Sequence, residues 1–70
     1  MNHEEFEEKV RFWLGKRIAS DGDRWAAYEC MMWKYNEDPA RWSSQSLDAL
    51  YEQVRQEYPM WTLPELKEEV

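Results

Sequence analysis

The sequence has little of the residue types that usually support catalysis, metal binding or covalent cross-linking. Its 70 residues include one cysteine, one histidine and two isolated glycines. Cys30 cannot form a disulfide within the chain, and its apolar surroundings predict a buried, inert thiol. His3 has no Glu-x-x-His partner of the kind that holds metal in helical bundles. These absences predict a protein that is not an enzyme and that uses no cofactor and no metal.

Long hydrophobic stretches are also missing. No apolar run is longer than the four residues of Cys30–Trp33, whereas a membrane span needs roughly 20. Residues 1–5 are acidic and lack the apolar core of a signal peptide. A free cysteine without a signal peptide fits a reducing compartment, so we expect a cytoplasmic protein with no membrane association.

Basic residues are scarce relative to acidic ones. Nine bases against fifteen acids leave a net charge of −6, and residues 47–70 alone carry six acids and two bases. Phosphate neutralisation dominates nucleic-acid binding, so direct nucleic-acid binding is disfavoured. Lys16 and Arg17, with Arg11 nearby, form the main basic cluster, which is typical of favourable charge at the C-terminal end of a helix.

What the chain does have is helical periodicity. Apolar residues spaced three and four apart predict helices over about 4–19, 24–36 and 46–58. β-branched residues are rare and no segment alternates as a half-buried strand does. The helix over 24–36 is apolar nearly all the way round, so we expect it to be the central helix, with neighbours or a second contact face on each side.

Proline, glycine and capping residues divide these helices. Asp38 followed by Pro39 predicts a short turn that would place Trp42. Gly22, in the turn before the second helix, is able to take a positive φ. The Thr62–Glu65 segment matches a capping box and predicts a short helix over about 62–69. That helix would carry Leu63, Leu66 and Val70.

Together these signals predict a single all-α domain, residues 1–70. We expect a small three-helix bundle with a short fourth helix at its C-terminal end. The domain is small enough to need either heavy packing or a partner chain, because a core of this size buries only about 60% of the chain's surface.

Charged residues on the third helix suggest one candidate contact surface. Asp48 and Glu52 lie opposite its apolar stripe, with about 6 Å between residues four apart. Carboxylates at that spacing can imitate a phosphate backbone in front of a basic groove. They are also typical of a solvated face that keeps a protein soluble, and this second interpretation is favoured.

Aromatic residues are the more informative signal. Five Trp, four Tyr and two Phe exceed what a core of this size encloses easily, so some rings should be exposed. Trp42 and Trp61 lie in predicted loops beside prolines. Such residues serve either as lids over the core, which the usual burial of Trp favours, or as anchors for a partner.

The first helix offers a second aromatic surface. Phe12 lies nearly opposite the apolar stripe, with Gly15 and Ala19 on its side. A ring beside two small residues allows close approach of another helix. Either another segment of the chain covers this face, or it is a site of self-association.

Two functions fit these features. The first is a protein-binding inhibitor or adaptor that covers a basic, nucleic-acid-handling protein, with Asp48, Glu52, Trp42 and Trp61 as candidate contact residues. Small acidic helical proteins of this type include phage-encoded inhibitors and nuclease immunity proteins, an analogy at the level of type alone. The alternative is a homodimeric structural or regulatory accessory protein that associates through Phe12.

Overall fold

The computed structural model describes residues 2–68, which form four α-helices and a 3-10 turn with no β-strand among them. The elements are α1 (His3–Arg17), α2 (Arg24–Glu37), α3 (Pro39–Ser43), α4 (Leu47–Glu57) and η1 (Pro59–Trp61). The predicted all-α class and its three main helices are confirmed. None of these helices is long and apolar enough to cross a membrane.

Each α-helix begins with a side chain that caps its first turn. Asn2, Asp23, Asp38 and Ser46 each accept a hydrogen bond from the backbone N–H three residues ahead, at 2.8, 2.9, 3.3 and 3.1 Å. Such caps satisfy N–H groups that have no partner inside the helix, and each contributes about 1 kcal/mol. Local sequence therefore determines where every α-helix starts.

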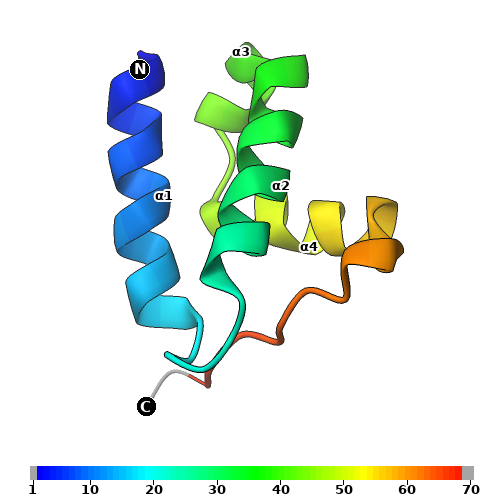
Figure 1. Cartoon of the computed structure of the whole chain (residues 1–70). Helices are drawn as coiled ribbons and strands as arrows, with labels where there is room; N and C mark the ends of the chain where they lie inside the picture. Colours follow the sequence, from blue (N-terminus) through cyan, green and yellow to red (C-terminus); the bar gives the residue numbers. More distant parts are fainter. Residues whose placement is uncertain (1, 69–70) are drawn as a thin grey trace.

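α2 is the central element, as its all-round apolar pattern predicts. It lies antiparallel beside α1, with α3 at its C-terminal end and α4 crossing behind it (Figure 1). Phe6 of α1 stacks on Tyr35 of α2, with ring centroids 3.7 Å apart. The side chains that form the core are Phe6, Val10, Leu14, Ile18, Ala27, Cys30, Met31, Met32, Tyr35, Trp42, Leu47, Leu50, Tyr51 and Val54.

α3 is the short turn predicted from Asp38 and Pro39. It places Trp42 against the core with only 3% of its surface exposed. Trp42 is thus placed as a lid over the core, the alternative that its sequence favoured, and its indole ring has almost no surface left for a second protein.

The helix predicted over 62–69 is absent from residues 62–68, which run as an extended segment back beneath the α1–α2 loop (Figure 1). Thr62 is not the N-cap of a further helix, because it ends η1 in the left-handed conformation, with φ 47° and ψ 57°. The segment is held instead by tertiary bonds. The N–H of Lys67 donates to the Arg17 carbonyl at 2.7 Å, and the Tyr51 hydroxyl donates to the Pro64 carbonyl. Residues 69 and 70, which complete the predicted helix, lie outside the described residues.

Gly22 is needed for space and not for a positive φ, which no glycine among the described residues adopts. A Cβ atom at Gly22 would lie 2.9 Å from Ile18 Cγ2 and 3.3 Å from Pro64 Cβ. The α1–α2 turn therefore fits closely between the end of α1 and the returning C-terminal segment.

Candidate functional site

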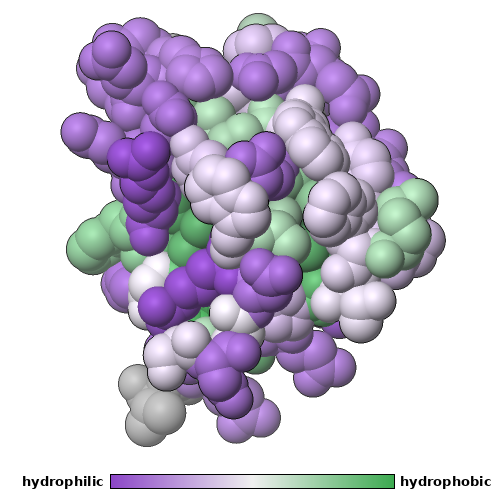
Figure 2. Space-filling model, viewed as in Figure 1, coloured by the Kyte–Doolittle hydropathy of each residue, from purple (hydrophilic) through white to green (hydrophobic). Residues whose placement is uncertain are grey.

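The largest apolar side chains left in contact with solvent gather on one part of the surface. Figure 2 shows strongly hydrophilic surface at the N-terminal end of α1 and paler, more apolar surface over α2 and η1. Within residues 2–68, four of the five large exposed hydrophobic residues belong to these two elements. The exposed fractions are 69% for Trp25, 43% for Trp33, 73% for Met60, 43% for Trp61 and, on α1, 70% for Phe12.

Three residues four apart form a ridge along the outer side of α2. Trp25, Glu29 and Trp33, which we call the α2 ridge, fall on one helix face because four residues make just over one turn. Among the described residues, no ion pair or hydrogen bond engages the Glu29 side chain. The ridge therefore presents an unpaired carboxylate between two exposed indole rings.

Residues of η1 extend the C-terminal end of this ridge. Trp33 meets Trp61 edge-to-face at 5.5 Å and Tyr58 edge-to-face at 6.3 Å, and we call these three rings the η1 cluster. Such geometries are favourable for aromatic pairs. The Tyr58 hydroxyl donates to Glu37 Oε2 at 3.2 Å, which ties η1 to the end of α2. The three rings are thus held by one another and by the end of α2.

An ionic network borders the η1 cluster. Lys34 Nζ lies 2.7 Å from Glu57 Oε2 and 3.6 Å from Glu37 Oε1. The hydrogen bond between Lys34 and Glu57 raises the pKa of the lysine and lowers the pKa of the carboxyl group. Lys34 thus joins the end of α2 to the end of α4 beside the exposed rings.

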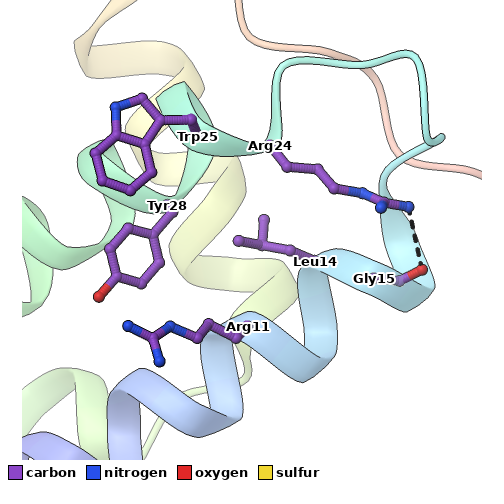
Figure 3. A pocket seen from close by; sticks show the side chains of 6 residues that line it. All are labelled: Arg11, Leu14, Gly15, Arg24, Trp25 and Tyr28. Atoms are coloured by element: carbon purple, nitrogen blue, oxygen red, sulfur yellow. Dashed lines mark hydrogen bonds between the residues drawn. The ribbon is translucent and has the colours of Figure 1, made fainter.

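A groove of about 290 Å³ opens between α1 and α2 at the other end of the ridge (Figure 3). We call it the α1–α2 groove. It is lined by Arg11, Leu14, Gly15, Arg24, Trp25 and Tyr28. Trp25 and Tyr28 stack with centroids 5.8 Å apart and planes 18° apart, so they form one aromatic wall. The hydroxyl of Tyr28 donates to Glu7 Oε1 at 2.6 Å, and this bond is the main reason that the pKa of Tyr28 is raised.

The acidic pair predicted on α4 is engaged within the chain. Asp48 accepts a 2.7 Å hydrogen bond from Trp13 Nε1 and pairs with Arg17 at 3.2 Å, which links α4 to α1. Glu52 pairs with Arg55 at 3.3 Å. Both carboxylates remain about half exposed, but each already has a cation beside it. They are weaker candidates for a phosphate-like surface than their spacing suggests.

The proposed self-association face is only partly assembled. Phe12 and Gly15 are both exposed, whereas Ala19 lies beyond the end of α1 at Arg17. Phe12 and Gly15 also line different grooves, because Phe12 faces a second groove of about 240 Å³ with Lys9 and Lys16. The predicted ring with two small neighbours therefore does not form one continuous helix face.

The cysteine thiol is buried, as expected. Cys30 has no exposed surface, and burial raises the pKa of its thiol, which disfavours the reactive thiolate. Within residues 2–68, no group of three His, Cys, Asp or Glu side chains is placed to hold a metal ion. Comparison of the chain with protein-family models, with curated proteins and with solved structures finds no match.

The α2 ridge was not among the predicted contact surfaces, although its pattern is visible in the sequence. Trp25, Glu29 and Trp33 are spaced four apart in a helix recognised as apolar on every side. That pattern establishes a second face but not which face turns inward, because the choice depends on where α1 and α4 pack.

Proposed function

We propose that this chain is a protein-binding module that docks through the α2 ridge and the η1 cluster onto a basic surface of a partner. It acts as an inhibitor or adaptor by covering that surface, and a nucleic-acid-handling protein is the kind of partner whose surface would be basic. The observation that carries the proposal is the exposure of Trp25 and Trp33 on either side of the unpaired Glu29.

The chemistry of the ridge favours a cationic group on the partner. A lysine or arginine that reaches Glu29 would meet a carboxylate with an exposed indole ring one helical turn away on either side, and indole rings attract cations. Tryptophan is also among the residues that contribute most to binding energy at protein interfaces. The net charge of −6 would speed the approach of a basic protein at low ionic strength.

The rigidity of the site supports the same function. The opposite side of α2 is fixed in the core by fully buried residues such as Ala27 and Met31. Trp33 is held by two edge-to-face contacts. A surface that is ordered in advance loses less side-chain entropy on binding, so more of the contact energy appears as affinity.

A homodimeric accessory protein is the second candidate. It is favoured by Phe12, which is 70% exposed and lies outside the ridge. Self-association through this ring would bury it in an isologous contact between two α1 helices. Measurement of the mass in solution, with Phe12→Asp as the disrupting change, separates this candidate from a module that binds a different protein.

The proposal is tested by affinity capture from lysate of the source organism with the wild-type chain, Trp33→Ala and Glu29→Lys as bait. We expect the wild type to retain a basic protein that elutes with salt. Loss of a central tryptophan should weaken binding about 30-fold or more, the effect of removing an interface hot spot.

Glu8→Lys is the matched control, because it makes the same charge change on an exposed α1 residue outside the ridge. It should keep most of the captured protein. Equal capture by all four baits would overturn the proposed surface. A wild-type bait that captures nothing and is dimeric by light scattering would favour the homodimer.

A further inference from the structure

The α1–α2 groove differs from the ridge beside it in charge. Arg11 lies on one side of the groove and Arg24 on the other, although acids outnumber bases in the chain as a whole (Figure 3). The Arg24 guanidinium is committed to the end of α1, where it donates to the Ile18 carbonyl at 2.6 Å and to the Gly15 carbonyl at 3.4 Å. Arg11 is therefore the cation with more capacity for a ligand.

Arg11 makes only weak contacts with its neighbours, among them an interaction with the Tyr28 hydroxyl that opposes the rise in the pKa of that tyrosine. Its Nη2 atom lies 3.9 Å from Glu7 Oε1, which is too long for a hydrogen bond, and its side chain is 66% exposed. The guanidinium lies 5.6 Å from the centre of the Tyr28 ring. Glu7 also accepts the 2.6 Å hydrogen bond from Tyr28 and lies 3.8 Å from His3 Nε2, so its carboxylate is shared among three groups. An incoming carboxylate could therefore form a closer, bidentate contact with Arg11 than Glu7 does.

The walls of the groove are suited to a flat apolar group. Trp25 and Tyr28 form a continuous aromatic surface, and the Leu14 side chain lies between them and α1 (Figure 3). Gly15 carries no side chain and lies at the Arg24 end of the groove (Figure 3), where no atom would lie within 4 Å of a Cβ. A volume of about 290 Å³ is at the lower end for small-molecule pockets, which run from about 300 to 1,000 Å³.

We infer that the α1–α2 groove binds a single aromatic ring that carries a carboxylate, with the ring on Trp25 and Tyr28 and the carboxylate on Arg11. The same chemistry is found in a free aromatic acid and in a C-terminal aromatic residue of a peptide. This site is separate from the proposed function, which needs a cation at Glu29, although Trp25 borders both.

The test is an NMR titration that follows the indole N–H resonance of Trp25, identified by its loss in Trp25→Phe. The probes are phenylacetate, benzyl alcohol and benzylamine, which share a ring and a methylene group but differ in charge. We expect phenylacetate to bind about tenfold or more tightly than the other two, the effect of one charge-assisted hydrogen-bonded pair. N-acetylphenylalanine then distinguishes the sources, because tighter binding than phenylacetate identifies a peptide C-terminus and weaker binding a free acid.

Two variants locate the ligand. Arg11→Gln should weaken phenylacetate binding about tenfold and leave benzyl alcohol unchanged, because only the carboxylate contact is lost. Gly15→Leu should weaken both by placing a side chain in the groove, and it is compatible with folding because leucine favours a helix more than glycine does. Arg55→Gln, the same change on α4, is the control. Equal binding of the three probes, or binding that is unchanged in Gly15→Leu, would overturn the inference whether or not the α2 ridge binds a protein.

Discussion

The two sides of α2 are built from different kinds of residue. The inner side packs Ala27, Cys30 and Met31, none of which has any exposed surface. The outer side carries Trp25 and Trp33, which are 69% and 43% exposed. Small or flexible side chains allow α1 and α4 to approach the central helix closely, whereas an indole ring would hold them apart.

The inner side of α2 stabilises the fold, whereas the outer side presents residues that another molecule could contact. Burial of an apolar side chain contributes about 1.5–3 kcal/mol to folding, so the inner side of α2 accounts for much of the stability. The exposed rings of the outer side contribute little of this kind and leave apolar surface in water. Such surface on a small protein usually marks a contact site. The following predictions test whether the two sides are as independent as this comparison implies.

The largest expected effect comes from a matched pair of truncations on the two sides. Met31→Ala should lower the free energy of unfolding by about 2–5 kcal/mol, because it leaves a cavity in the core. Trp33→Ala should lower it by only about 1 kcal/mol, because the ring is half exposed and has two edge contacts. Urea unfolding followed by circular dichroism measures both. Similar losses in the two variants would show that Trp33 is part of the folding core and would break the comparison.

The next largest difference in stability is expected between alanine substitutions at the two glycines. Gly22→Ala should destabilise the fold by about 1–3 kcal/mol, because its Cβ would lie 2.9 Å from Ile18 Cγ2 and 3.3 Å from Pro64 Cβ. Gly15→Ala should instead stabilise α1 by about 0.5–1 kcal/mol, because the position is helical and open. Thermal unfolding of the two variants provides the measurement, with opposite shifts expected. A stable Gly22→Ala variant would mean that the C-terminal segment moves away without loss.

The smallest difference in stability is expected between two tyrosine hydroxyls, one buried in the core and one beside the ridge. Tyr51 is fully buried and donates to the Pro64 carbonyl, whereas Tyr58 beside the ridge donates to the exposed Glu37. Tyr51→Phe should cost about 1 kcal/mol at neutral pH, the net worth of one hydrogen bond. Tyr58→Phe should cost less, because water replaces the lost bond.

The same pair of variants should also differ in how folding stability depends on pH. Burial raises the pKa of Tyr51 to about 12, while an unfolded tyrosine titrates near 10. The unfolded chain therefore loses this proton first, so stability is complete below about pH 10 and falls as the pH rises towards about 12. Tyr51→Phe should flatten this alkaline decline more than Tyr58→Phe does, measured by urea unfolding across that range. Equal slopes in both variants and the wild type would show that Tyr51 titrates like a solvated residue.

The sequence predicted some residues of the candidate site but could not tell which tryptophans are exposed. Trp61 was expected as either a lid or an anchor, and its 43% exposure and contact with Trp33 keep it among the candidates. Trp42 has the same kind of sequence environment, beside a proline, yet is 3% exposed. Sequence could not distinguish the two tryptophans, because burial depends on which surface a short turn folds against.

What the sequence determined by itself was the helical class, the three main helices and the start of each α-helix. These depend on contacts within about four residues, such as the Asp23 and Ser46 caps and the spacing of apolar residues along one turn. Only the tertiary structure decided that residues 62–68 run as an extended segment despite their capping-box pattern. There the long-range bonds of Lys67 to Arg17 and of Tyr51 to Pro64 replace the hydrogen bonds that a helix would have formed. The same packing turned Trp42 inward and left the α2 ridge outside, because a helix that is apolar all round acquires an inner side only when its neighbours are in place.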